Sequence, residues 1–242
     1  MAPIKLHADY RSQPSRAVGV MLMMNKDKID YEFVLQAFER TPEERAKYQK
    51  EISPFGTVPA LEVDGLPTIL ESSAALQYLA ELDGVPEHWY PKSAKGRMLV
   101  NQYISWHGPN MRKNASGYLE AYFMEPFFMK KTCPEDELEE IKEGFEKMMD
   151  RLENYWLKDS EYLAGDEISI ADLQCISELV NVEPTDIDMG KERRPKMAAY
   201  IQRVKDKLSP VYDTVFKDPM EQFGMGFKMF QRSKQLQNVT KL

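Results

Sequence analysis

The sequence of 242 residues has few cysteines and few histidines. Its two cysteines, Cys133 and Cys175, are far apart and form no CxxC pair. This usage is typical of a reducing compartment, and we expect both thiols to be buried and inert. The three histidines (His7, His88 and His107) are too scattered to indicate a metal site by their spacing. The sequence therefore predicts no metal centre.

Long apolar runs and excess positive charge are also missing. The first residues, MAPIKLHADY, lack the basic start and apolar core of a signal peptide. The most apolar run, residues 17–24, is too short to span a bilayer. The net charge of −7 argues against general nucleic-acid binding, because neutralising phosphates needs a basic surface. We therefore expect a cytoplasmic protein that binds neither nucleic acid nor membrane.

The first third of the chain mixes two periodicities, as an α/β segment does. Pro42 follows Thr41 at the start of one helical pattern, and Asp64-Gly65 indicates a β-hairpin. The predicted order is β-α-β-α-β-β-α, with a parallel first pair of strands and an antiparallel last pair. The elements are strands at 4–10 and 31–38, helices at 15–26, 41–51 and 72–82, and two strands around the hairpin.

In the remainder of the chain, apolar residues recur with the spacing of α-helices. Residues 83–92, DGVPEHWYPK, contain one glycine and two prolines and are interpreted as a linker. The words around Ser169 and Asp172 resemble a capping box, with Asp in place of Glu or Gln. The end of the chain, residues 228–242, is basic and acid-free, and we expect a solvated or frayed tail there. Helices are predicted at 94–125, 134–157, 169–181 and 194–216.

Six short sequence motifs together resemble those of the cytosolic glutathione transferases. They are SQPSRAV, TVPAL, ESSAALQYL, VPEHWYP, AGDEISIADL and RPKMAAYIQRV, and they run in the family's order from residue 12 to residue 204. The forms SQPxRAV, WYP and RPKxxxxxxRV are most similar to the theta class and its bacterial dehalogenase relatives. The resemblance implies a thioredoxin-like, glutathione-binding domain over residues 1–82 and an all-helical domain carrying the electrophile pocket over 93–242. It also implies a homodimer.

The activity implied by the resemblance is conjugation of glutathione thiolate to small apolar electrophiles, of the detoxification type. Glutathione is then a co-substrate, and no cofactor is expected. A glutathione-dependent haloalkane dehalogenase is an alternative. A non-catalytic ligand-binding or structural protein with the same fold is another alternative. The intact site motifs argue against it, and Glu44, discussed below, is a mild argument for it.

The first word contains the candidate thiolate donor. The helix that follows it offers unpaired N–H groups and a positive dipole end, which suit an anion. In the theta class the donor is the serine of the SQP word, which falls on Ser12. Tyr10 is the rival, because other classes use a tyrosine near the end of the first strand. Ser15 lies in the first helical turn, where we expect its hydroxyl to satisfy local backbone groups.

Two further words imply contacts to glutathione. In the family the bond before Pro59 is cis and turns the backbone of Val58 toward the cysteinyl part of glutathione. Glu71 and Ser72 correspond to the pair that holds the γ-glutamyl end, the serine taking the carboxylate and the glutamate the ammonium. Ser72 can also cap the following helix.

One position departs from the family pattern. Theta proteins commonly carry a His-Lys pair for the glycyl carboxylate, and Glu44-Arg45 stands there in this chain. Arg45 can replace the lysine as a carboxylate clamp, whereas Glu44 would repel the same group. Lys47 or Lys50 are alternative contacts.

The electrophile pocket is implied by the word WHGPNMRK. Its arginine, Arg112, corresponds to a theta-class arginine that faces the second substrate, where it would stabilise developing negative charge. A surface arginine on a helix is the other interpretation of the same residue. Tyr10 and Gln13 complete the residues that we expect at this pocket.

Overall fold

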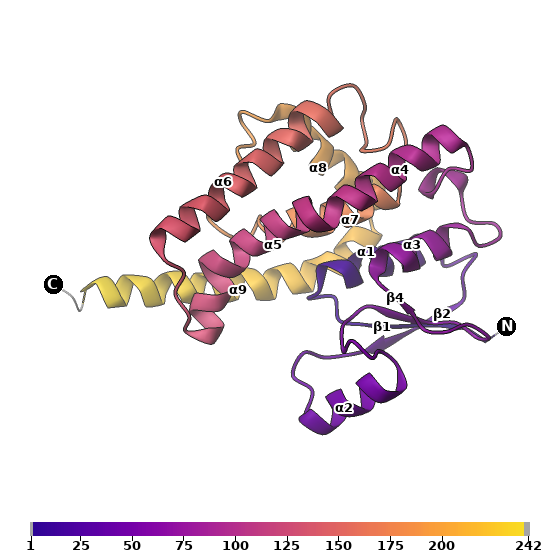
Figure 1. Cartoon of the computed structure of the whole chain (residues 1–242), viewed down its shortest axis with the longest axis horizontal. Coiled ribbons are helices and arrows are strands. Elements are labelled where there is room, and N and C mark those ends of the chain that lie inside the picture. Colours follow the sequence, from indigo (N-terminus) through magenta and orange to yellow (C-terminus); the bar gives the residue numbers. More distant parts are fainter. Residues whose placement is uncertain (1, 240–242) are drawn as a thin grey trace.

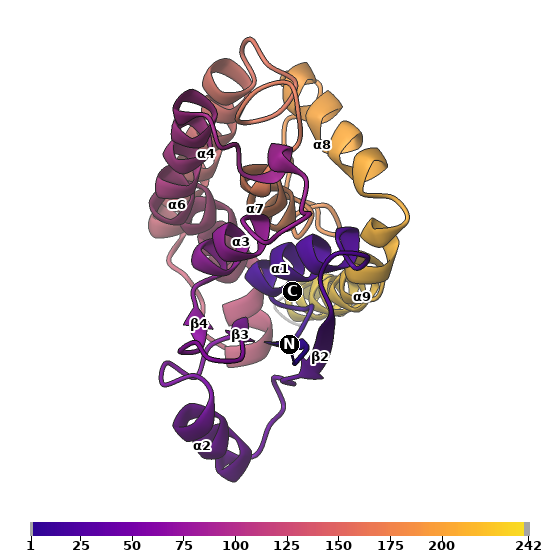
Figure 2. The same ribbon diagram turned by 90° about the vertical axis from the view of Figure 1, so that its right-hand side faces the viewer.

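The computed structural model of the chain describes residues 2–239, with side chains as far as residue 235. A small sheet with its helices forms one end of the molecule, and a larger group of helices forms the other (Figure 1). Seen from the side, helices α1 and α3 lie between the sheet and that larger group (Figure 2). The bounds of these elements are given below.

The sheet has four strands in the order β2-β1-β3-β4. Strand β1 pairs in parallel with β2 and antiparallel with β3, and β3 pairs antiparallel with β4. The predicted order and directions are therefore confirmed. The first two strands end earlier than predicted; after β1 the N–H of Ser12 bonds back to the carbonyl of Asp9 at 2.9 Å, which turns the chain away. The strands are β1 (Ile4–Ala8), β2 (Tyr31–Leu35), β3 (Ala60–Glu62) and β4 (Ile69–Leu70).

Three helices complete the first unit, and each begins at a helix-start signal or directly after a strand. Helix α1 begins directly after Ser12, and α2 begins after Thr41 with Pro42 in its first turn. Proline is tolerated there because the first N–H groups of a helix have no partner inside it. The helices are α1 (Gln13–Met24), α2 (Pro42–Glu51) and α3 (Ser72–Ala80).

The second unit contains one long helical stretch that is locally widened into π-helix. Pro109 and Pro126 lie inside the widened segments, and proline has no N–H to continue an α-helical ladder. The stretch runs through α4 (Ala94–Trp106), η2 (His107–Arg112), α5 (Lys113–Leu119) and η3 (Glu120–Met129). The other elements beyond the first unit are η1 (Glu87–Trp89), α6 (Glu135–Arg151), η4 (Leu152–Trp156), α7 (Ile170–Leu179), α8 (Pro195–Leu208) and α9 (Val211–Val239).

Two predictions about the C-terminal part are wrong. The helix predicted at 194–216 is broken between α8 and α9 at Pro210, which lacks an N–H donor. The tail expected to be solvated or frayed is not frayed, because it is helical from residue 228 to Val239, although most described side chains from residue 228 to 235 are exposed or half-buried; residues 240–242 lie outside the described residues. Phe227 and Phe230 explain the difference, because they are buried against Phe123 and give α9 an apolar face.

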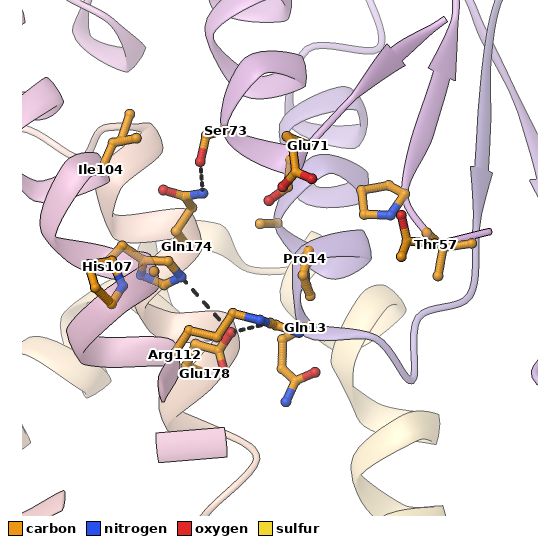
Figure 3. Close-up of a pocket in the computed structure, with 16 residues that line it drawn as sticks. Gln13, Pro14, Thr57, Glu71, Ser73, Ile104, His107, Arg112, Gln174 and Glu178 are labelled. Atoms are coloured by element: carbon orange, nitrogen blue, oxygen red, sulfur yellow. Dashed lines mark hydrogen bonds and ion pairs between the residues drawn. The ribbon is translucent and has the colours of Figure 1, made fainter. Parts of the chain in front are cut away.

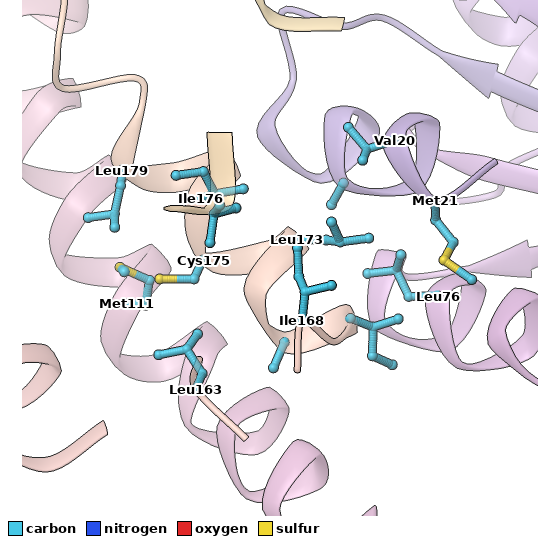
Figure 4. Close-up of a cluster of buried hydrophobic side chains, with 14 of the residues drawn as sticks. Val20, Met21, Leu76, Met111, Leu163, Ile168, Leu173, Cys175, Ile176 and Leu179 are labelled. Atoms are coloured by element: carbon cyan, nitrogen blue, oxygen red, sulfur yellow. The ribbon is translucent and has the colours of Figure 1, made fainter. Parts of the chain in front are cut away.

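One large apolar core joins the two units. It contains Leu6 of β1, Val18 of α1 and Leu173 of α7, all fully buried. Met21 and Leu76 of the first unit lie beside Leu173 in Figure 4. All ten residues of α7 are buried, and α1 packs against both α3 and α7. The position of α1, which begins directly after Ser12, is therefore fixed from two sides.

The cysteines differ in exposure. Cys175 lies in this core, and burial raises the pKa of its thiol to about 12. Cys133 is only half-buried in the connection between η3 and α6, so the expectation of two buried thiols is wrong for it. Both cysteines are free. None of the helices in the described range is long and apolar enough to cross a membrane.

Candidate functional site

A cavity of about 370 Å³ lies where the two units meet (Figure 3). The start of α1, the loop before β3 and the start of α3 supply one side of it. The π-helical η2 and the buried helix α7 supply the other. Its lining includes Gln13, Pro14, Thr57, Val58, Pro59, Glu71, Ser72, Ser73, His107, Arg112, Gln174 and Glu178. Among the described residues, no group of three or more His, Cys, Asp or Glu side chains could hold a metal ion.

Ser12 stands at the N-terminal end of α1, directly before the lining residues Gln13 and Pro14. Its backbone is extended, and its side chain makes no capping hydrogen bond to the helix. Its carbonyl accepts the N–H of Arg16 at 3.1 Å. Because the hydroxyl is half-buried and free of a capping role, it can donate to an anion at the positive end of the helix.

The two neighbouring hydroxyls are enclosed by protein. Tyr10 packs its ring against Phe33, with centroids 4.8 Å apart, and against Gly19 of α1, where a Cβ would collide with it. Its buried hydroxyl has no partner, and burial raises the pKa of Tyr10. Ser15 is fully buried, and its hydroxyl also has no partner. The expectation that Ser15 satisfies local backbone groups is therefore wrong, and Tyr10 does not line the cavity.

The opposite wall contains two unusual backbone conformations. The peptide bond between Val58 and Pro59 is cis. Glu71 has a φ of 69°, in the left-handed region that costs a non-glycine residue free energy. Glu71 occupies the capping position of α3, and Ser72 is the first helical residue, so Ser72 does not cap this helix as expected. All four residues line the cavity.

The structure gives Glu44 and Arg45 local partners. The Glu44 carboxylate accepts the N–H of Thr41 at 2.7 Å, and the Thr41 hydroxyl accepts the N–H of Glu44 at 3.2 Å, which is a capping box for α2. Arg45 donates to the carbonyls of Phe38 and Arg40 at 2.7 and 3.1 Å. Neither residue lines the cavity, and the departure from the family pattern serves the start of α2.

Lys47 and Lys50 lie on the same helix. Lys47 borders a second, more open hollow beside His7 and pairs with Glu51 at 4.0 Å. Lys50 is exposed on α2. The structure therefore brings together Gln13, Val58, Pro59, Glu71, Ser72 and Arg112 of the predicted residues, with Ser12 adjacent, and it leaves Arg45 and Tyr10 outside.

Arg112 lies on the far wall and is held by a carboxylate that the sequence did not reveal. Its Nη1 donates to Glu178 at 2.7 Å, and the Glu178 side chain is only 2% exposed. Nε2 of His107 lies 3.9 Å from the same carboxylate. Burial lowers the pKa of His107 to about 4, so this imidazole is neutral near pH 7.

Other lining residues come from α7 and were also missed. The amide of Gln174 donates to the hydroxyl of Ser73 at 2.8 Å, and its oxygen is buried without a partner. Gln174 and Glu178 are one helical turn apart, so they share a face of α7. A signal existed in the sequence, because Gln174 and Glu178 are polar residues one turn apart in a mostly apolar helix.

Arg16 fastens the loop before α1 to the second unit. It is fully buried and donates to the carbonyl of Tyr10 and to that of Ser177, each at 2.8 Å, and to the side chain of Asn181. Burial lowers the pKa of its guanidinium to about 10. A buried arginine with several acceptors stabilises one arrangement of the two segments that it joins.

Comparison with known proteins gives this architecture a family. The model "Glutathione S-transferase, N-terminal domain" matches residues 15–82, and "Glutathione S-transferase, C-terminal domain" matches residues 118–206. Glutathione S-transferase T1 of Arabidopsis thaliana is 32% identical over 220 residues, which cover 88% of this chain and 87% of that protein. The chain belongs to the glutathione S-transferase family.

Relatives of the theta class are among the proteins that this transferase matches. Glutathione S-transferase theta-1 of Gallus gallus is 28% identical over 253 residues, covering 98% of this chain and 92% of the relative. The human T1-1 enzyme in its apo form has a TM-score of 0.82 and 27% identity, covering 93% of this chain and 91% of that one.

A human theta-2 structure is described as a complex with glutathione and an unknown ligand. It has a TM-score of 0.84 and 26% identity, and the match covers 93% of this chain and 91% of that chain. The predicted fold, a thioredoxin-like unit followed by a helical one, is therefore confirmed for this transferase.

Proposed function

We propose that this protein conjugates the thiolate of glutathione to small apolar electrophiles. One observation carries the proposal. The Ser12 hydroxyl lies at the start of α1 and makes no capping hydrogen bond to the helix, beside a cavity lined by Val58-Pro59 and Glu71-Ser72. The theta-class relatives, named as glutathione S-transferases, support it. The human theta-2 structure described with glutathione, and the human theta-class structure described with a glutathione conjugate, support it further.

The chemistry requires a stabilised sulfur anion. The thiol of glutathione is largely protonated near pH 7, and its thiolate is the nucleophile. Lowering a thiol pKa by ~2 units needs about 2.7 kcal/mol of differential stabilisation. A charge-assisted hydrogen bond from Ser12 and the dipole of α1 can together supply an effect of that size.

The remaining contacts follow from the lining residues. The backbone of Val58, turned by the bond to Pro59, pairs with the cysteinyl backbone of glutathione. The Ser72 hydroxyl and N–H take the γ-glutamyl carboxylate, and Glu71 takes the ammonium group. Residues 1–82 then hold glutathione, and the domain over 93–242 supplies the electrophile pocket, with Gln13 and Arg112 at its border.

The glycyl carboxylate is assigned to the α2 side. Arg45, with Lys47 and Lys50 as alternatives, would act there as an exposed cation. An exposed ion pair contributes only about 0–1 kcal/mol. Affinity for glutathione should therefore depend mainly on Glu71 and Ser72.

The proposal is tested first by turnover. The full chain is incubated with glutathione and benzyl chloride, and S-benzylglutathione and chloride are measured against the uncatalysed reaction. Catalysed formation of the conjugate is expected. Faster turnover of a small haloalkane such as dichloromethane would favour the dehalogenase alternative. Glutathione binding without turnover of either compound would favour a binding protein.

Calorimetry tests the glutathione contacts separately. Glu71→Ala and Ser72→Ala should each weaken glutathione binding by about 1.5–3 kcal/mol, because each leaves a charged group of the ligand without its hydrogen bond. Arg45→Ala is the matched comparison and should cost about 1 kcal/mol or less. Unchanged dissociation constants for Glu71→Ala and Ser72→Ala would contradict the assigned γ-glutamyl site.

We further propose a homodimer in the cytoplasm. The exposed Phe55 and Met98 support it, because they are 65% and 51% accessible and a partner subunit would cover such apolar side chains. Light scattering at micromolar concentration should give twice the chain mass. A monomer mass would contradict this assignment.

A further inference from the structure

The carboxylate of Glu178 is the most enclosed charged group at the cavity. Its side chain is 2% exposed, and its two oxygens accept hydrogen bonds from Arg112 Nη1 and Ser116 Oγ, each at 2.7 Å. A buried carboxylate needs such partners, because an uncompensated charge is costly to remove from water. Figure 3 shows the Arg112 guanidinium and the His107 ring turned toward Glu178.

A chain of hydrogen bonds links this carboxylate to the start of α1. The Ser116 hydroxyl donates to Glu178 and accepts the side-chain amide of Gln13 at 3.1 Å. Gln13 follows Ser12 directly. The position of Arg112 is thus tied, through Glu178, to the residue beside the proposed thiolate donor.

The charges of Arg112 and Glu178 on this wall cancel each other. Arg112 is the one cation among the described lining residues, and the carboxylate that it contacts removes its net charge. The Arg112 side chain remains 42% exposed, so part of the guanidinium still faces the cavity. His107 and Gln174 add no charge, and Glu71 on the opposite wall adds a negative one. An anion that enters beside Glu178 therefore meets no net positive charge from the side chains of this wall.

We propose that Glu178 is a positioning residue that restricts this transferase to uncharged electrophiles. Held by Glu178, Arg112 presents N–H groups to the atom that gains negative charge during the reaction, and the nearby carboxylate disfavours substrates that are already anionic. In the displacement, glutathione sulfur forms a bond to carbon while the carbon–halogen bond breaks and the halide leaves with the bonding pair. This inference rests on the proposed conjugation activity.

The competing interpretation is that Glu178 only braces α7 against α5. A brace lost by substitution would lower the turnover of every substrate alike. A residue that sets the charge of the pocket would change the relative turnover of a neutral and an anionic substrate. Selectivity is therefore the measurement that separates the two roles.

The experiment uses two probes with the same reacting carbon and leaving group, benzyl chloride and the anion 4-(chloromethyl)benzoate. The ratio of their kcat/KM values is measured for the wild type and for Glu178→Gln, which keeps the size of the side chain. We expect the wild type to prefer benzyl chloride, and the ratio to fall by about tenfold or more in the variant. The matched control is Glu183→Gln, since Glu183 pairs with Lys191 and Lys205 away from this cavity.

A second variant keeps the inference falsifiable if Glu178→Gln does not fold. Arg112→Gln leaves Glu178 without its cation, so the preference for benzyl chloride should rise by about fivefold. Equal losses for both probes, or a wild type that prefers the anion, would overturn the inference while leaving the conjugation activity intact. A wild type that binds glutathione but conjugates neither probe would overturn both.

Discussion

Ser12 and Ser169 each stand directly before a helix, and their hydroxyls have different surroundings. Ser169, before α7, is buried, and its hydroxyl donates to the Asp172 carboxylate at 3.0 Å. The same carboxylate accepts the N–H groups of Ser169 and Leu163 and the hydroxyl of Tyr200, at 2.8, 3.0 and 3.1 Å. Ser12, before α1, is half-buried and makes no capping bond.

The comparison separates a folding role from a chemical role. The hydroxyl of Ser169 is committed to the protein, so its loss should cost stability. The hydroxyl of Ser12 is available to a ligand, so its loss should cost turnover and little stability. Position at a helix start is shared by both residues; the difference lies in what else the fold offers the oxygen.

The largest effect is expected from Asp172→Ala. Removing the carboxylate leaves several buried donors without an acceptor, at about 1–3 kcal/mol each, so we expect a loss of about 3–5 kcal/mol in the free energy of unfolding. Urea denaturation measures it. Asp166→Ala, an exposed position nearby, is the control and should stay within about 0.5 kcal/mol. If Asp172→Ala were as stable as the wild type, Ser169 and Asp172 would not have the folding role assigned to them.

The stability that Asp172 contributes should also depend on pH. Burial raises the pKa of Asp172 to about 6 from an ordinary value of 3.8, so between these values the native state binds more protons than the unfolded state. The contribution is then full below about pH 4 and is lost as pH rises through 6. Relative to Asp172→Asn, which does not titrate, the wild type should lose up to about 3 kcal/mol between pH 4 and 7. A difference that grows with pH would contradict the assignment.

For Ser12→Ala we expect turnover to fall by about tenfold or more, equivalent to about 1.4 kcal/mol, with glutathione binding nearly unchanged. The hydrogen bond is strongest to the thiolate, which reacts, and weaker to the thiol, which only binds. The ultraviolet absorbance of the bound thiolate should titrate at higher pH in the variant. Its free energy of unfolding should stay within about 0.5 kcal/mol of the wild type.

A smaller effect is expected from Ser169→Ala, about 1 kcal/mol of stability, as for other substitutions at the start of a helix. Turnover per folded molecule should not change. A fall in turnover comparable to that of Ser12→Ala, measured at equal folded fraction, would show that the two serines do not divide the roles as described.

The smallest effect is expected from Tyr10→Phe. Its hydroxyl is buried without a partner and away from the cavity lining, so turnover should change by less than about threefold. Loss of activity in this variant, together with an unmoved thiolate titration in Ser12→Ala, would identify the tyrosine as the donor instead.

Much of the fold could be predicted because it depends on local signals. The alternation in β1, the hairpin at Asp64-Gly65 and Pro42 after Thr41 each act over a few residues, and the structure agrees at each of them. The tail was mispredicted for the opposite reason. Its helix depends on Phe227 and Phe230 meeting Phe123, a residue about a hundred positions earlier in the chain.

The site residues that could be predicted are those that lie together in one short sequence motif. Val58-Pro59 and Glu71-Ser72 are neighbours in the chain and both pairs reach the cavity. Glu178 was not predictable as the partner of Arg112, because the two are brought together only by packing of α7 against the long helical stretch. Arg45 was expected to face the ligand, yet backbone carbonyls nearby compete for its donors.

The core that passes without interruption from the sheet into α7 has a consequence for recombination between relatives. The linker at residues 83–92 looks like a natural crossover point, since it divides the chain between its two units. A chimera joined there would place α1 against a foreign α7, and both Val18 and Arg16 would meet an unmatched surface. Chimeras that exchange the first unit together with α7 should therefore fold, whereas chimeras that exchange the first unit alone should not.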